Sequence, residues 1–413
     1  MPAMAARARL IVTEFDAQQL SNTLWAFARL SFSDQPIIEA MAHQVQSAQH
    51  FFGPQEISNT TWAFASLVFL NLPVLEGLAD QAIRMATHFD PQGLAMMAWS
   101  FATCELRDLP LFDIISERVL SIVHEFDPQF LAITAWAFST LSILNIPLMQ
   151  ALARRACAAA TEFGAQSLSN LAWAFARLEF RESPVLDAIA SAVLDRSSEC
   201  SPLNLANLAW AFATLRDAPG PVLTVLARES MSKLPEFSGQ QLANMVWAFA
   251  WLSFVDASWM EAHPRFARPL LPEYTPQGLC NTAWAFAKLV VLDEPLMISI
   301  SHEAQKRFQL FQPQNFSNFV WAFAIFHLLD GQLMNSIAYD FREKLPEFDA
   351  QALTNTLWAY ARLSDIPSHA LDPILEQASR KLSQWCPQSL SSMSWALAAL
   401  TFRSRKLMQL IAV

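Results

Sequence analysis

Amide side chains recur along this chain at steps of 37 residues. The same position holds a glutamine in ten of eleven copies, beginning with Gln18, and Leu203 is the exception. Four residues later, an asparagine occurs in eight copies: Asn22, Asn59, Asn170, Asn207, Asn244, Asn281, Asn318 and Asn355. Because an amide both donates and accepts hydrogen bonds, it can pair with the edges of nucleic-acid bases. Gln18 and the eight asparagines are therefore candidate RNA-binding residues.

Tryptophans mark the same repeat, at Trp25, Trp62, Trp99, Trp136, Trp173, Trp210, Trp247, Trp284, Trp321, Trp358 and Trp395. In a structural reading, the amides form hydrogen-bonded ladders between adjacent helices and the indoles pack along the same seam. In a functional reading, the amides pair with bases while indoles or arginines stack on them, one base per repeat. A residue that is identical in every copy carries no information about which base is present. We therefore predict a structural role for the tryptophans, while both readings of the asparagines stay open.

Two positions beside these residues differ between copies and are better candidates for specificity. One is occupied by Gln19, Glu56, Gly93, Phe130, Ser167, Asn204, Gln241, Gly278, Asn315, Ala352 and Ser389. The other is occupied by Arg29, Ser66, Thr103, Thr140, Arg177, Thr214, Trp251, Lys288, Ile325, Arg362 and Ala399. The four cations of the second series could contact RNA. The alternative is that they are ordinary solvated residues beside the apolar stripe.

The elements that must position these residues are helices. Good N-cap residues, often followed by proline, begin one predicted helix per copy, at Asp16, Asp90, Asp127, Ser201, Ser238, Thr275 and Asp349. Each of these helices then runs through Trp-Ala-Phe-Ala or a close variant. A second helix follows a second cap and proline, as at Asp34 with Pro36 and Asn71 with Pro73, with apolar residues at spacings of three and four. No segment alternates with period two, so strands are not expected.

A fixed period in this range is typical of a solenoid, because one hairpin cannot bury its apolar face without its neighbours. We predict an all-α, right-handed α-α superhelix of eleven 37-residue helical hairpins, forming one array over residues 1–413. Residues 1–14 would be the remnant of a preceding second helix. The repeats would start near residues 15, 52, 89, 126, 163, 200, 237, 274, 311, 348 and 385, and the last would be incomplete.

At 100° per residue, Gln18, Asn22, Trp25 and Arg29 fall on one side of the first helix. Leu20, Leu24 and Phe27 fall on the other side. The pattern predicts that the apolar side is buried. We expect the first helices to line the concave face of the superhelix.

Composition limits the other possibilities. Apolar residues make up 53% of the chain and no apolar run approaches the length of a membrane span. The five cysteines are far apart and odd in number, which indicates free thiols. Phosphate-cradling loops, HExxH and nucleophile elbows are absent from the sequence. We expect no enzymatic activity, no cofactor, no metal, no small-molecule substrate and no membrane association.

The net charge of −10 argues mildly against nucleic acid, which favours a basic surface. Many of the acids stand at predicted helix starts, such as Asp16, Asp90 and Asp127, where they suit the cap and the helix dipole. The negative balance therefore follows largely from the number of helices. A locally basic inner face remains compatible with it.

Both termini fall within the repeat, and we expect that the chain is a slice of a longer array or that a partner covers its ends. Arg7 and Arg9, with no acid before Glu14, are compatible with a mitochondrial transit peptide. The alternative is that they are repeat residues, equivalent to Arg155 and Cys157.

The Trp-Ala-Phe-Ala core, the preceding Phe-Asp-Pro-Gln-x-Leu segment and the period of 37 resemble the heptatricopeptide and octotricopeptide repeat proteins. These are relatives of organellar proteins with RAP and FAST-kinase-like domains. The resemblance rests on segments such as LSNTLWAFARL (residues 20–30) and LANLAWAFATL (residues 205–215). It implies binding of mitochondrial or plastid RNA, in processing, stability, translation or ribosome assembly. No RAP-like module is found, so a nuclease role is not implied, and a cytoplasmic location stays open.

Two hypotheses follow for the function. In the first, single-stranded RNA lies along the first helices, with one nucleotide per repeat and about ten or eleven nucleotides in all. In the second, the chain is a scaffold whose concave groove binds a peptide or a partner protein. A basic groove would favour RNA, and an acidic or apolar groove would favour protein. The face on which the Arg29 series lies is the most informative observation.

Overall fold

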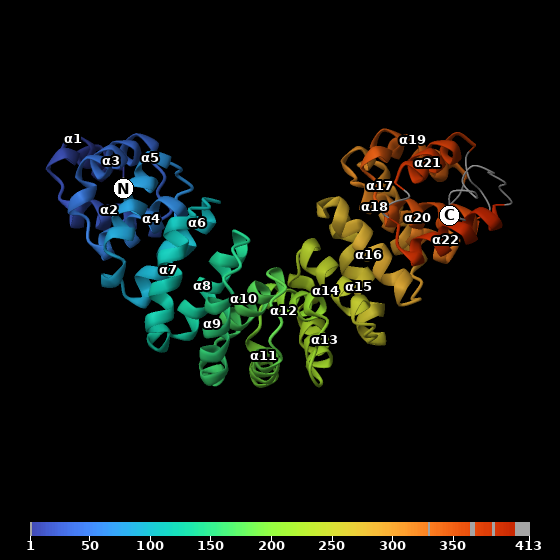
Figure 1. Cartoon of the computed structure of the whole chain (residues 1–413), viewed down its shortest axis with the longest axis horizontal. Coiled ribbons are helices and arrows are strands. Elements are labelled where there is room, and N and C mark those ends of the chain that lie inside the picture. Colours follow the sequence, from blue (N-terminus) through green and yellow to red (C-terminus); the bar gives the residue numbers. More distant parts are fainter. Residues whose placement is uncertain (1, 329–330, 364–367, 382–384, 401–413) are drawn as a thin grey trace. The chain divides into compact units, whose positions relative to one another are not determined.

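The computed structural model describes residues 2–328, 331–363, 368–381 and 385–400. Throughout this described part the chain is helical and contains no strand, which confirms the predicted all-α solenoid. The helices pack against their neighbours in chain order and divide into two compact units, Met1–Val222 and Leu223–Val413 (Figure 1). The predicted second helix of the last hairpin, residues 401–413, lies outside the described residues.

Unit 1 alternates two kinds of helix. The first helices of the hairpins are α2 (Ala17–Arg29), α4 (Pro54–Ser66), α6 (Pro91–Thr103), α8 (Pro128–Thr140), α10 (Ala165–Arg177) and α12 (Pro202–Leu215). The second helices are α1 (Pro2–Leu10), α3 (Gln35–Ala48), α5 (Leu72–Arg84), α7 (Leu109–Ile122), α9 (Ile146–Ala158) and α11 (Ser183–Arg196).

Unit 2 continues the same alternation. Its first helices are α14 (Gly239–Trp251), α16 (Pro276–Lys288), α18 (Pro313–Phe326), α20 (Ala350–Leu363) and α22 (Pro387–Ala399). Its second helices are α13 (Val222–Lys233), α15 (Ala257–Leu270), α17 (Glu294–Gln305), α19 (Gly331–Phe341) and α21 (Ser368–Arg380).

Short 3-10 helices follow most of the second helices, which the sequence did not lead us to expect. They are η1 (Val12–Glu14), η2 (Gln49–Phe51), η3 (Ala86–His88), η4 (Val123–Glu125), η5 (Ala160–Glu162), η6 (Ser197–Glu199), η7 (Leu234–Glu236), η8 (Leu271–Glu273), η9 (Phe308–Leu310) and η10 (Arg342–Glu347). Tight turns of this kind are common at the end of an α-helix, where carbonyl groups lack partners.

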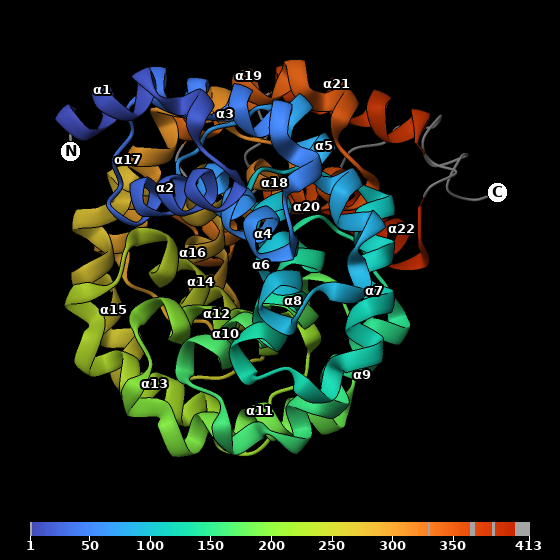
Figure 2. The same ribbon diagram turned by 90° about the vertical axis from the view of Figure 1, so that its left-hand side faces the viewer.

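Within each unit, the first helices form an inner layer and the second helices an outer layer (Figure 2). Consecutive first helices contact each other more extensively than consecutive second helices do. Closer spacing of the inner helices is what a curved two-layer array requires. Each unit therefore presents its first helices on its inner face, as predicted.

The predicted caps and the predicted core are confirmed. Asp16 accepts a hydrogen bond from the backbone N–H of Gln19 at 2.8 Å, and Asp34 accepts one from Ile37 at 3.3 Å. Each such bond satisfies a backbone donor that has no partner inside its own helix. The apolar stripe of α2, formed by Leu20, Leu24 and Phe27, is buried.

A left-handed residue closes the first helix of nine copies, and none of these residues is glycine. They are Ser31, Val68, Glu105, Ser142, Glu179, Arg216, Ser253, Val290 and His327, with φ between 49° and 57°. Behind Ser31, the N–H of Phe32 donates to the carbonyl of Phe27 at 2.9 Å. This bond belongs to the Schellman motif, in which glycine usually occupies the left-handed position. The chain therefore reverses direction here without the glycine that would favour the left-handed conformation.

Candidate nucleic-acid interface

The amide residues lie on the inner face of each unit. All ten glutamines of the repeat are exposed, Asn22 is exposed, and the other seven asparagines are half-buried. Within the described part of the chain, none of the eight asparagine side chains hydrogen-bonds to another protein group, and none has a fully buried polar atom. Of the two readings of the asparagines, the ladder of amide hydrogen bonds between adjacent first helices is therefore not found among the described residues.

The physical reason is that these helices touch through other residues. Alanine, leucine and phenylalanine positions such as Leu168, Leu171 and Phe175 are buried between neighbours. The amides project from the adjoining side, and at α18, α20 and α22 they line two open depressions. Their hydrogen-bonding capacity is left to solvent or to a ligand.

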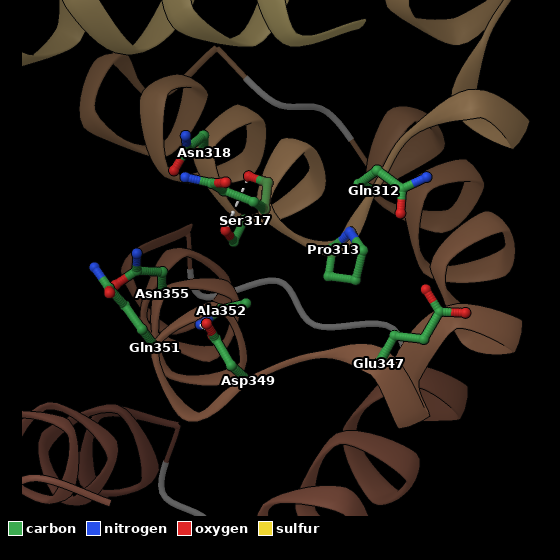
Figure 3. Close-up of a pocket in the computed structure, with 10 residues that line it drawn as sticks. Gln312, Pro313, Ser317, Asn318, Glu347, Asp349, Gln351, Ala352 and Asn355 are labelled. Atoms are coloured by element: carbon green, nitrogen blue, oxygen red, sulfur yellow. Dashed lines mark hydrogen bonds between the residues drawn. The ribbon is translucent and has the colours of Figure 1, made fainter. Parts of the chain in front are cut away.

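Figure 3 shows one of these depressions, between the N-terminal halves of α18 and α20. It has a volume of about 340 Å³, and Asn318, Asp349, Gln351 and Asn355 are among the residues that line it. A second depression of about 330 Å³ lies one repeat further on, between α20 and α22, and is lined by Gln351, Asn355 and Gln388. Gln351 and Asn355 thus face two depressions, and the pattern advances by one repeat.

The tryptophans lie beside the amides and connect consecutive first helices. Ring centroids are 6.4 Å apart for Trp25 and Trp62 and 6.5 Å apart for Trp62 and Trp99. In unit 2, the distances are 6.4 Å for Trp321 and Trp358 and 6.2 Å for Trp358 and Trp395. Their predicted packing along the seam is found. None of them is fully buried, however, and Trp25 is 43% and Trp395 50% exposed. The indoles therefore also form part of the inner surface.

The cations of the Arg29 series lie over these indoles. The guanidinium carbon is 5.8 Å from the ring centroid for Arg29 over Trp25, 5.6 Å for Arg177 over Trp173, and 5.5 Å for Arg362 over Trp358. Such distances are within the range of cation–π attraction. The arginines are exposed and are held by the indoles on the face that carries the amides.

Unit 2 contains one variation on this pattern. Trp251 takes the place of the cation in its copy and stacks on Trp247 at 5.4 Å. The ammonium of Lys288 lies 5.1 Å from the ring of Trp251 and 4.9 Å from that of Trp284. It also donates a hydrogen bond to the carbonyl of Trp251 at 3.4 Å. A cation is therefore placed among three indoles, on the same face as the amides.

Several residues of the Gln19 series have a structural role. This position is the third residue of the first helix, where a side chain can bond back to the N-cap backbone. Gln19, Asn204 and Gln241 complete capping boxes with their N-cap residues. Glu56 and Asn315 accept from the N-cap backbone N–H without the reciprocal bond. The amide of Asn204 is also buried and donates to Ser169 at 2.9 Å. Five of the eleven residues at this position therefore serve helix capping, and the role in specificity stays a prediction.

A row of acids that we did not predict from the sequence lies along the N-terminal ends of the first helices. A glutamate ends the 3-10 helix of seven copies: Glu14, Glu125, Glu162, Glu199, Glu236, Glu273 and Glu347. All seven are exposed, and Glu347 lines the same depression as Gln351 and Asn355. The signal was available, because these residues recur at multiples of 37.

A second missed series stabilises the contacts between repeats. Arg307 donates to the carbonyl of Tyr274 at 2.5 Å, and Lys381 donates to the carbonyls of Pro346 and Phe348 at 2.8 and 2.7 Å. Lys344 donates to the carbonyls of Gln309 and Phe311. Each cation satisfies carbonyl groups at the 3-10 turn of the preceding copy, where the helix dipole is negative. These cations are thus engaged in repeat packing.

The described residues contain neither a candidate membrane-spanning helix nor a candidate metal site. None of the described helices combines the length and the apolar character needed to cross a membrane. No group of three or more histidine, cysteine, aspartate or glutamate side chains is arranged to hold a metal ion in the ranges that the structure describes.

No curated protein matches the sequence. Among the structures compared, a chain from "Homology model of the full-length AP-3 complex in an intermediate open conformation" is 12% identical, with a TM-score of 0.28. The match covers 98% of this chain and 82% of that one. The family model of the RNA-editing substrate-binding complex 6 protein matches twice, over residues 1–121 and 74–218, with starting points nearly two repeats apart. Since these matches extend over more than half of the sequence, the chain belongs to the family of the RNA-editing substrate-binding complex 6 protein.

Proposed function

We propose that the chain binds single-stranded RNA along the inner faces of its first helices and acts in RNA processing. The observation that carries the proposal is the set of eight asparagine side chains that have no protein partner. A half-buried amide without a partner is costly unless solvent or a ligand satisfies it. Together with exposed glutamines, partly exposed indoles and cations over those indoles, they supply the groups that recognise unstacked bases and phosphates.

The family supports this proposal, because the protein after which it is named belongs to a complex that binds RNA-editing substrates. The resemblance of the Trp-Ala-Phe-Ala repeats to heptatricopeptide and octotricopeptide proteins supports the same class of ligand. It also supports a location in a mitochondrion or plastid, within RNA processing, stability or translation. Imaging of the tagged full-length chain beside organelle markers tests the location separately from the binding.

The two successive depressions in unit 2 favour a ligand with a repeating structure. Gln351 and Asn355 line the depressions on both sides of α20. A bound polymer could therefore place one of its monomers in each depression. A single strand offers one base at every step of its backbone. We propose that each copy of the repeat contacts about one nucleotide.

Filter binding of single-stranded RNA across a salt series tests the proposal. Binding should be in the micromolar range or tighter at low salt and should weaken as salt rises, because phosphate contacts release counterions. Asn170→Ala combined with Asn207→Ala should weaken binding without loss of helicity. The matched control is Gln309→Ala, which changes an exposed amide outside the first helices. Absence of micromolar binding at low salt would count against RNA as the ligand.

A protein partner is the second candidate, on a different surface. In unit 1, the turns between the two helices of successive copies expose large apolar side chains: Val68, Leu70, Leu72, Leu109, Leu144 and Ile146, between 44% and 92% exposed. Exposed apolar patches are typical of protein contacts. A partner that docks there would be retained in a pull-down after nuclease treatment, and Leu70→Asp with Leu144→Asp would release it. Such a partner leaves the inner face open.

A further inference from the structure

One copy in unit 2 has an additional indole on the inner face. Trp251 ends α14 at a position where the other copies hold arginine, lysine, serine, threonine, isoleucine or alanine. Its ring stacks on that of Trp247 with an interplanar angle of 21°, and its centroid lies 5.9 Å from that of Trp284 on α16. All three rings are half-buried, so each exposes part of its surface to solvent. Together they form an aromatic surface that spans two neighbouring first helices.

An ammonium group is held at this aromatic surface. Lys288 ends α16, and its position is fixed by the rings of Trp251 and Trp284 and by the carbonyl of Trp251. Proteins that bind single strands combine positive charge, which attracts the phosphates, with aromatic rings on which bases stack. Trp247, Trp251, Trp284 and Lys288, which we call the Trp251 and Lys288 cluster, supply both within one small area.

The turns that follow α14 and α16 carry no charge at their left-handed position. This position holds Ser253 after α14 and Val290 after α16. In unit 1, two copies hold an exposed glutamate there, Glu105 and Glu179. The charge of Lys288 is therefore not offset by a carboxylate at this position.

The carboxylates around the Trp251 and Lys288 cluster belong to other helix ends. Asp256 and Asp293 are half-buried and accept capping bonds at 2.9 and 2.7 Å, and the exposed Glu294 begins α17 in the outer layer. Glu236 and Glu273 are exposed before the N-terminal ends of α14 and α16. Those ends are about 18 Å from the cluster along the helix axes. A phosphate at the cluster would thus be closer to the ammonium group than to these two glutamates.

Building on the proposed function, we propose that the Trp251 and Lys288 cluster anchors one nucleotide of the bound RNA and so fixes the register of the strand in unit 2. The base stacks on the indoles, and the charge of Lys288 attracts a phosphate. From this anchor the strand continues along unit 2 to the depressions that Asn318, Gln351 and Asn355 line. The other copies have no aromatic residue at the position of Trp251, so they hold a nucleotide less tightly.

Fluorescence anisotropy with a labelled 12-nucleotide single-stranded RNA tests the anchor on the full chain. Trp251→Thr introduces the residue that three other copies have at this position, such as Thr214. It should lower the affinity at least about fivefold, the loss of one stacked base, and leave the slope of log affinity against log salt unchanged. Lys288→Gln should lower the steepness of that slope by about 0.7, the change for one phosphate contact on a single strand. Tyr339→Thr removes an exposed ring from α19 in the outer layer and should bind as the natural chain does.

The outcomes separate the two proposals. If the natural chain fails to bind the RNA at low salt, the proposed function fails and the anchor fails with it. If the chain binds, and Trp251→Thr binds as tightly as Tyr339→Thr, the anchor is overturned and RNA binding stands. Trp251→Phe keeps an aromatic plane and should stay within about threefold of the natural affinity. An equal loss in Trp251→Phe and Trp251→Thr, with helices intact by circular dichroism, would overturn the stacking.

Discussion

At the scale of single residues, His263 is out of place in the core of unit 2. It lies on α15, is fully buried, and packs between the rings of Trp259 at 5.0 Å and Phe286 at 5.5 Å. The eleven other positions at steps of 37 residues from it all hold leucine, isoleucine or methionine. Burial disfavours the charged imidazole and lowers the pKa of His263 to about 3.

The buried histidine predicts a dependence of stability on pH. In the unfolded chain its pKa is near 6.5, so between pH 6.5 and about 3 the unfolded state binds the extra proton. Stability is therefore complete above pH 6.5 and falls as the pH is lowered toward 3. Between pH 7 and pH 5 the loss from this residue is about 2 kcal/mol. His263→Leu should remove that part of the loss, as measured by urea unfolding at both pH values, whereas the exposed control His302→Leu should retain it.

Tyr274 presents a second departure from the repeat. Most equivalent positions hold phenylalanine, and the hydroxyl of Tyr274 is buried and has no hydrogen-bond partner among the described residues. Burial raises the pKa of this hydroxyl well above its usual value. Its ring fits because position 239 is glycine, where a Cβ would lie 2.5 Å from the ring.

Tyr274→Phe should therefore stabilise the protein. Removal of a buried polar group without a partner is expected to raise the free energy of unfolding by about 1 kcal/mol. Chemical denaturation measures the difference, and Tyr339→Phe is the control because Tyr339 is 77% exposed. A lower stability for Tyr274→Phe would indicate that the hydroxyl has a partner, such as a bound water.

At the scale of elements, the turn after each first helix stores local strain. Val68 and Val290 hold left-handed backbone conformations, with φ of 54° and 57°, and both side chains are exposed. For an L-residue this conformation costs about 1–2 kcal/mol, and the branched Cβ of valine adds crowding. The Schellman bonds and the packing of the hairpin must offset that cost.

Val68→Gly should raise the free energy of unfolding by about 1 kcal/mol, because glycine adopts the left-handed region without a steric penalty. Val290→Gly should act similarly in unit 2. Thermal unfolding followed by circular dichroism measures both. Val74→Gly, within helix α5, is the contrasting control and should destabilise. If Val68→Gly also destabilised, the valine side chain would have to contribute more through contacts than it loses through strain.

At the scale of the whole molecule, the repeating amides predict how affinity depends on RNA length. If each copy contacts about one nucleotide, affinity should rise with length and level off near ten or eleven nucleotides. Fluorescence anisotropy with oligonucleotides of 4 to 20 nucleotides measures the curve, with double-stranded RNA of 16 base pairs as the control. A plateau below about five nucleotides would show that one local site, such as the Trp251 and Lys288 cluster, accounts for the binding.

The helical solenoid, the caps and the buried stripe could all be predicted from the sequence, because they follow from local rules. An N-cap aspartate bonds three residues ahead whatever surrounds it. The spacing of Leu20, Leu24 and Phe27 also decides which side of a helix can be buried. The Trp-Ala-Phe-Ala motif likewise resembles that of RNA-associated proteins, and this resemblance needs no tertiary contact.

Which polar side chains have a hydrogen-bond partner in the protein depends on tertiary packing. Asn204 and Asn207 are both helical asparagines with near-identical surroundings in sequence. Asn204 is buried in a capping box, whereas Asn207 has no protein partner. The burial of His263 likewise depends on a neighbouring copy, because Phe286 of the next first helix packs on its ring. Contacts between different copies set both features, and local sequence preferences carry little information about such contacts.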